Sequence, residues 1–184
     1  MKRQIRSSVF ETNSSSTHSI AISKAPVVAG KYISFGIGEF GWENDTADTA
    51  DYLYTAILEQ NNSTELLNKL KEILDKHSIK YKFEEPRYEK SADGKYEWLD
   101  YGYIDHGYEL GEFLDAVLND EDLLMRYLFG NSTVYTGNDN QDSDPSGCDI
   151  ADEYYWTEDE HGKYIEVPNP YHDSENYEYF YKGN

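Results

Sequence analysis

The sequence predicts an α+β fold: a mixed or antiparallel sheet with about three to four helices packed on it, in a single compact domain over residues 1–184. Short stretches of alternating apolar and polar residues are separated by segments with helical periodicity. A chain of 184 residues typically builds one hydrophobic core. With 38% hydrophobic and 15% aromatic residues, the chain has enough apolar area to fold.

The first third of the chain predicts strands followed by a helical pair. Alternating patterns occur at residues 4–10, 17–23 and 30–35. Asp45 or Thr46 is expected to open a helix with an apolar stripe, and a second helix should start near Asn62. These two helices are expected to pack together on the sheet.

The remaining elements are predicted by the same patterns. Further strands are expected at residues 79–83, 87–90, 95–98 and 132–136. A helix or broken helix pair should cover residues 112–128, with Gly130 as its stop. Residues 141–184 form an acidic, Tyr-rich C-terminal section. We expect it to contain a hairpin with a turn at Gly162, followed by an edge strand or a mobile tail.

The negative charge is concentrated in the C-terminal half. The net charge is −20, yet the first 31 residues carry +4, whereas 23 acidic and four basic residues follow from Ser91 onward. Such a surface repels phosphate, which excludes direct binding of duplex DNA through the acidic half. It attracts basic protein surfaces, so a basic protein partner is expected.

The expected compartment is the cytoplasm of a bacterial host cell. The N-terminal residues are charged and are not followed by the apolar stretch of a signal peptide. No apolar run approaches the roughly 20 residues of a membrane span, so no membrane partner is expected. The single Cys148 cannot form an internal disulfide.

A polar motif at residues 10–19 is the sharpest local feature. It reads Phe-Glu-Thr-Asn-Ser-Ser-Ser-Thr-His-Ser and lies between two alternating segments. One interpretation is a catalytic loop with Ser15 as nucleophile, His18 as general base and Glu11 as orienting group or metal ligand. The other is a structural turn in which Ser and Asn side chains satisfy the backbone, which the residue types favour.

The polar motif also carries a family resemblance. Residues 6–19 resemble the N-terminal signature of a family of phage, prophage and Gram-positive bacterial proteins, and residues 39–43, 103–106 and 137–140 are also similar to that family. The resemblance implies a phage-related origin. Because small acidic phage proteins without a virion role are often host-defence inhibitors, it also implies an anti-CRISPR protein.

If these four family-like segments converge, they form a candidate site. They supply carboxylates and imidazoles suited to acid–base work or metal binding. The residues concerned are Glu11, His18, Glu43, Asp105, His106 and Asp139.

A calcium loop is a further candidate. Asp142, Asp144, Ser146 and Glu153 have the spacing of calcium ligands, with Gly147 at the turn. The segment follows a predicted strand rather than a helix, which argues against this interpretation. The sequence therefore favours no cofactor and leaves calcium as the alternative.

Together these observations favour an inhibitor that acts by binding rather than an enzyme. Its acidic surface would dock on the cationic channel of a nucleic-acid-processing enzyme, foremost a type II CRISPR effector nuclease with its guide RNA, and block DNA binding or cleavage. The alternatives are a hydrolase or nucleotide-modifying enzyme built on residues 11–19, or an accessory phage protein that binds another basic partner. The partner-binding candidates are Tyr154, Tyr155, Trp156, Glu158, Asp159 and Glu160.

Overall fold

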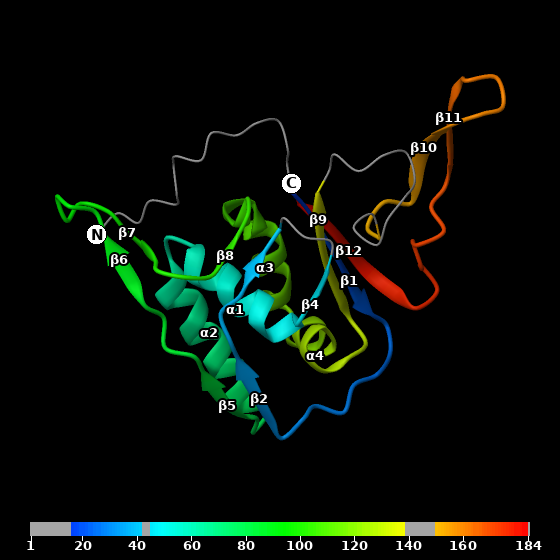
Figure 1. Ribbon diagram of the computed structural model, residues 1–184. Helices are drawn as coiled ribbons and strands as arrows, with labels where there is room; N and C mark the ends of the chain where they lie inside the picture. The colour runs from blue at the N-terminus through cyan, green and yellow to red at the C-terminus, as the bar shows by residue number, and fades with distance from the viewer. Residues whose placement is uncertain (1–15, 42–44, 139–149, 184) are drawn as a thin grey trace.

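The computed structural model describes residues 16–41, 45–138 and 150–183. At its centre lies a four-stranded antiparallel sheet with the strand order β12-β1-β9-β4 (Figure 1). Its strands are β1 (Ser16–Ser23), β4 (Asp45–Ala47), β9 (Thr133–Asn138) and β12 (Tyr177–Gly183). The predicted strand at residues 4–10 lies outside the described residues.

Strand β1 is central, and every residue in it is buried. Ile20 and Ile22 join the hydrophobic core, and small residues such as Ser19 and Ala21 alternate with them. Because β1 is hydrogen-bonded on both sides, its backbone N–H and C=O groups are paired, and the strand can be buried without leaving them unsatisfied. The polar end of the motif thus belongs to the middle of the sheet.

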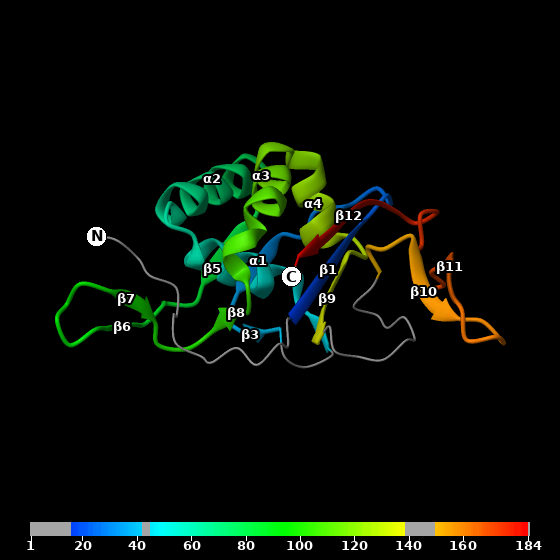
Figure 2. The ribbon, with the colours of Figure 1, turned by 90° about the horizontal axis from the view of Figure 1, so that it is seen from above.

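The helices cover one side of this sheet, and the hairpin of β10 (Tyr154–Glu158) and β11 (Tyr164–Pro168) lies on the other (Figure 2). Tyr52, Phe113 and Tyr127 fill the core between the helices and β1. The helices are α1 (Thr49–Glu59), α2 (Ser63–Lys76), α3 (Gly111–Asn119) and α4 (Glu121–Phe129), with the short 3₁₀ helix η1 (Gly107–Leu110) before α3.

The start of α1 corrects one prediction. Asp45 and Thr46 pair with β9 in the sheet, and the helix is instead capped by Asp48, whose carboxylate accepts the N–H groups of Ala50 and Asp51. An Asx residue can cap a helix or sit in a strand, and only the pairing with β9 decided which one would cap. Asp120 caps α4 in the same way, which breaks the predicted 112–128 helix into two.

The remaining strands form separate two-stranded ladders rather than joining one mixed sheet. Two ladders are parallel: β2 (Tyr32–Phe35) with β5 (Lys80–Phe83), and β3 (Glu39–Phe40) with β8 (Tyr103–Ile104). Two are antiparallel hairpins: β6 (Tyr88–Lys90) with β7 (Glu97–Leu99), and β10 with β11. The α+β class with four helices is confirmed, but its strands are distributed over several sheets.

The two hairpins project from opposite ends of the molecule (Figure 1). Gly94 and Gly162 have φ values of 66° and 71° in their turns, where a residue without a side chain avoids strain. Both hairpins were predicted from their turn chemistry.

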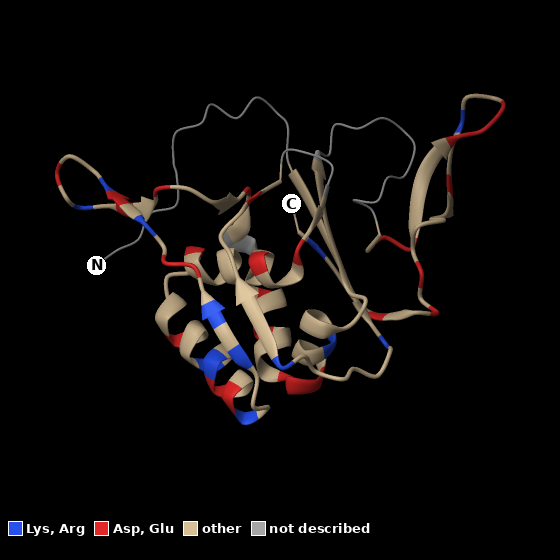
Figure 3. Cartoon of the chain, turned by 60° about the horizontal axis from the view of Figure 1, so that its bottom comes forward, with Lys and Arg blue, Asp and Glu red and all other residues tan. Residues whose placement is uncertain are grey.

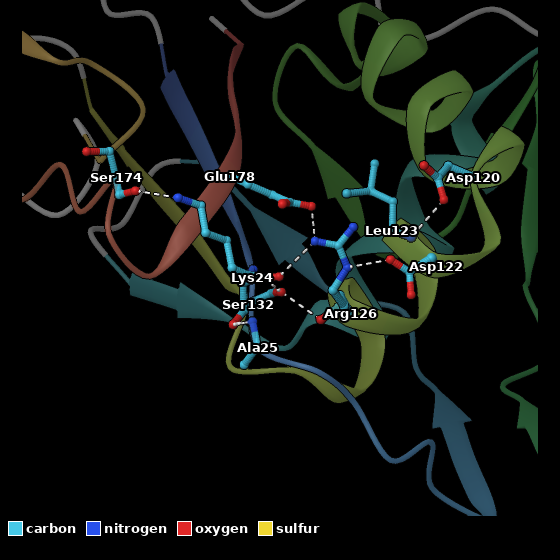
Figure 4. A network of polar contacts seen from close by, with 10 residues as sticks. Lys24, Ala25, Asp120, Asp122, Leu123, Arg126, Ser132, Ser174 and Glu178 are labelled. Carbon is cyan, nitrogen blue, oxygen red and sulfur yellow. Dashed lines mark hydrogen bonds and ion pairs between the residues drawn. The ribbon is translucent and has the colours of Figure 1, made fainter.

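The predicted C-terminal tail forms the edge strand β12, which pairs with β1. Arg126 of α4, with 11% of its side chain exposed, forms an ion pair with Glu178 of this strand and donates a 3.3 Å hydrogen bond to the carbonyl of Ser23 at the end of β1. Lys24 donates to the carbonyl of Ser174 at 2.7 Å, close to the same network (Figure 4). These contacts fasten the C-terminal section to the helical core.

Candidate functional site

The described parts of the four family-like segments meet at one end of the central sheet. Strand β1 begins at Ser16, which lies opposite Asn138 in the ladder, and Thr17 lies opposite Gly137. The described part of the 39–43 segment reaches the same place: Phe40 accepts a 2.9 Å hydrogen bond from the N–H of Asp105. Glu11, Ser15, Glu43 and Asp139 lie outside the described residues.

The turn after β8 is held by the C-terminal end of α1. Glu59 Oε1 accepts the N–H of Ile104 at 3.1 Å, and Gln60 Nε2 donates to the carbonyl of Gly107 at 3.0 Å. Any Cβ on Gly107 would collide with Glu59 Oε2, so the glycine allows this close approach. Between these two contacts His106 adopts a left-handed backbone with φ of 60°.

This turn presents a backbone oxygen to His18. The Nε2 of His18 lies 2.6 Å from the carbonyl oxygen of Asp105, and the side chain of His18 is only 1% exposed. Because a carbonyl can only accept, Nε2 carries the hydrogen of the neutral ring. Burial lowers the pKa of His18 to about 4, although the hydrogen bond and the charge of Asp105 act in the opposite direction. The ring is therefore neutral at physiological pH.

The described part of the site does not provide a nucleophile paired with a base. Ser16 Oγ is 3.2 Å from His18 Nε2, but that nitrogen already points its hydrogen at the Asp105 carbonyl and cannot take the serine proton. Asp105 contributes its backbone rather than its carboxylate to the contact with His18. These residues form a buried clamp that joins β1 to the β8 turn.

Glu59 was not anticipated from the sequence, because a carboxylate at the end of an amphipathic helix is usually exposed. Although part of the residue reaches the surface, its Oε2 is shielded from water and has no hydrogen-bond partner in the described part of the chain. Burial raises the pKa of Glu59 to about 8, and the nearby charge of Asp105 adds to this effect. The carboxyl group is thus protonated at neutral pH.

The predicted partner-binding residues are placed differently along the β10–β11 hairpin. Tyr154, Trp156 and Glu158 point to one exposed face, whereas Tyr155 on the opposite face is partly buried. Tyr154 is 49% exposed and Trp156 is 60% exposed. Tyr164 on β11, which is not among the partner-binding residues predicted from the sequence, is 62% exposed. Strand alternation was the signal that could have identified it.

The two acidic residues of the hairpin turn have different roles. Asp159 Oδ1 accepts the N–H groups of His161 at 2.8 Å and Lys163 at 3.0 Å, and therefore builds the turn. Glu160 has a side chain that is mostly exposed to solvent, with His161 as its near neighbour. Only Glu160 of this pair is available to a partner without disturbing the hairpin.

The calcium-loop candidates lie mostly outside the described residues, namely Asp142, Asp144 and Ser146. Glu153 is exposed just before β10, and its carbonyl oxygen accepts the N–H of Asn169 at 2.9 Å. Within residues 16–41, 45–138 and 150–183, no three His, Cys, Asp or Glu side chains are grouped so that they could hold a metal ion.

Among the helices of the described ranges, none is both long and apolar enough to cross a membrane.

Comparisons with known proteins leave the family resemblance as a prediction. No family model matches the chain, and no similar curated protein or solved structure was found.

Proposed function

We propose that this protein is a phage-derived inhibitor that works in the bacterial cytoplasm by docking on a cationic nucleic-acid-processing enzyme of host defence. The observation that carries the proposal is the outer face of the β10–β11 hairpin, where Tyr154, Trp156 and Tyr164 are exposed beside carboxylates. Exposed aromatic side chains at the tip of a projecting element are typical anchors of protein interfaces.

The charge of the hairpin supports a basic partner. Residues 152–166 contain six carboxylates, and Lys163 is the sole basic residue among them. Carboxylates of this density steer a positively charged surface toward the aromatic anchors, which mainly increases the association rate. In Figure 3 the acidic hairpin lies at one end of the molecule, while the lysines of α2 and β5 lie at the opposite end. The hairpin end is therefore the one suited to a cationic channel.

The target class that we favour is a type II RNA-guided DNA nuclease. Its guide and heteroduplex channel is lined with cationic side chains, so an acidic hairpin would compete there with nucleic acid. Under this proposal, the clamp around His18 has a structural role and supports the fold that carries the hairpin.

Inhibition of DNA cleavage tests the proposal directly. The purified protein should co-elute with the guide-loaded nuclease and block cleavage of a target duplex, and the inhibition should weaken as salt rises. The double variant Glu158→Lys/Glu160→Lys should lose at least about tenfold in affinity. The control Glu72→Lys/Asp115→Lys makes the same change of net charge on α2 and α3 and should inhibit like the native chain.

Two results would count against the proposal. No inhibition at stoichiometric excess in low salt, across several such nucleases, would exclude this target class. Equal losses in the hairpin variant and its control would show that net charge acts alone, without a docking surface.

An enzyme is the second candidate, and the convergence near His18 of the described parts of the four family-like segments favours it. An enzyme built there should lose activity in the double variant Glu11→Ala/His18→Ala while keeping its melting temperature. If the residues are structural, the melting temperature should instead fall by several degrees. Because His18 is buried and hydrogen-bonded, we expect the fall.

A further inference from the structure

The outer face of the β10–β11 hairpin alternates rings and carboxylates. In the antiparallel register, Trp156 lies opposite Glu166, and Glu158 lies opposite Tyr164. All four side chains belong to the exposed face. Residues directly opposite in such a ladder have Cβ atoms about 5 Å apart. Each carboxylate is therefore beside a ring of the neighbouring strand, and the two pairs alternate along the hairpin.

The same protein shows what such a pair binds. Next to β6 and β7, the guanidinium of Arg87 lies over the ring of Tyr101, 4.7 Å from its centroid. The hydroxyl of Tyr101 donates a hydrogen bond to the carboxylate of Glu84. That hydrogen bond lowers the pKa of Glu84, and the charge of Arg87 lowers it further. A ring, a carboxylate hydrogen-bonded to its hydroxyl, and a stacked guanidinium thus form one unit, in which the guanidinium has a further carboxylate, that of Asp100, 3.9 Å from its Nε.

Tyr164 and Glu158 repeat the first two members of this unit. A hydrogen bond to Glu158 raises the pKa of the Tyr164 hydroxyl, as Glu84 does for Tyr101. The carboxylate is thereby held next to a ring that is 62% exposed. The exposed ring and its carboxylate correspond to the ring of Tyr101, on which Arg87 stacks, and the carboxylate of Glu84 that is hydrogen-bonded to it.

Trp156 and Glu166 form a second ring–carboxylate pair, two residues further along the hairpin, and offer a similar position for a cation. Trp156 has the largest ring of the face and the strongest cation–π attraction of any side chain. It is two residues from Glu158 on the same strand, which corresponds to about 7 Å. Two cations spaced two residues apart on an extended segment would reach both pairs.

We propose that the outer hairpin face is a receptor for arginine side chains of the partner, with one guanidinium at Tyr164–Glu158 and a second at Trp156–Glu166. This inference rests on the proposed docking function and specifies its chemistry. A guanidinium is planar, stacks on rings and donates two parallel hydrogen bonds to a carboxylate, whereas a lysine ammonium is a compact, strongly hydrated charge. The face therefore selects arginine over lysine at equal charge.

Two synthetic peptides of equal charge test the selection. The full chain, labelled with ¹⁵N, is titrated with acetyl-Gly-Arg-Ser-Arg-Gly-amide and with its lysine counterpart, and the indole N–H of Trp156 is followed by NMR. We expect the arginine peptide to bind at least about fivefold more tightly. The indole N–H of Trp98, on the other hairpin, serves as the internal reference.

Single substitutions show which side chains produce the preference for the arginine peptide. Tyr164→Leu should lower the preference for the arginine peptide, because only the Trp156–Glu166 pair is left to stack a guanidinium, and Tyr164→Phe should keep most of the preference because the ring remains. The matched control Tyr96→Leu removes an exposed ring from the β6–β7 hairpin and should change nothing. These positions are exposed, so the dispersion of the core amide signals verifies that each variant is folded.

The outcomes separate this inference from the proposed function. Equal affinity for the two peptides at the hairpin would overturn arginine selection and leave docking of basic surfaces intact. Absence of any hairpin response to either peptide in low salt would overturn both. Hairpin signals that shift with protein concentration alone would identify a second copy of the chain as the occupant and would also overturn the inference.

Discussion

Replacing Glu59 by Gln should change how the stability of this protein depends on pH. The carboxyl has a pKa of about 8 in the folded chain against 4.5 in the unfolded chain, because its Oε2 is buried against Gly107. Between these values the folded state holds a proton that the unfolded state releases. The contribution of Glu59 to the free energy of unfolding should therefore decrease as pH rises from about 4.5 to about 8.

The magnitude follows from the size of the shift. Each pH unit within that window costs up to about 1.4 kcal/mol, so the contribution of Glu59 should fall by about 3 to 4 kcal/mol between pH 5 and pH 8. Glutamine keeps the oxygen that accepts the N–H of Ile104 and cannot ionise. The variant should gain stability relative to the native chain by this amount over the same range.

Urea unfolding at pH 5, 6, 7 and 8, followed by tryptophan fluorescence, measures the difference. His18 acts with the opposite sign: its pKa is lowered from 6.5 to about 4, so its contribution is lost as pH falls through that range. Because His18 is present in both proteins, its effect cancels in the comparison. The control Glu72→Gln, an exposed carboxyl on α2, should differ from the native chain by less than about 0.5 kcal/mol at every pH.

A stability difference between Glu59→Gln and the native chain that stays constant from pH 5 to pH 8 would refute this reasoning. It would mean that Glu59 ionises as readily in the folded chain as in the unfolded one. The urea dependence should be the same in both proteins, since a changed slope would indicate a different unfolded state rather than a titrating group.

Three further substitutions test the contacts that position the site and the hairpin. His18→Leu should cost about 1–3 kcal/mol in urea unfolding, since it leaves the carbonyl oxygen of Asp105 with only the long 3.4 Å hydrogen bond from Ser16 Oγ, and an unchanged midpoint would rule out the clamp. Gly107→Ala should cost a similar amount through overpacking, whereas Gly111→Ala, in open space, should be nearly neutral; equal effects would contradict the assigned close approach. Arg126→Met should speed hydrogen exchange of the β12 amides at least about tenfold by removing the ion pair with Glu178, and unaltered exchange would show that β12 is held by the ladder alone.

The sequence determined the features that depend on neighbouring residues. Helical periodicity predicted the α1–α2 pair, and turn chemistry predicted both hairpins, because a glycine such as Gly94 or Gly162 can adopt a positive φ without strain. The acidity of the C-terminal section was also accessible in advance, and so were Tyr154 and Trp156 as candidate anchors, whereas Tyr164 was missed and Tyr155 is partly buried. These features depend on the local preferences of neighbouring residues, which a short stretch of sequence is enough to show.

Only the tertiary structure decided which residues meet across the chain. The contact between His18 and the carbonyl of Asp105 joins residues 87 positions apart, and burial of Glu59 depends on Gly107 lying against it. Asp45 became a strand residue because β9 was available to pair with it. Burial and pairing are properties of the assembled core, so no local pattern could have shown that a helix-end carboxylate would keep its proton or that a polar motif would enter the middle of a sheet.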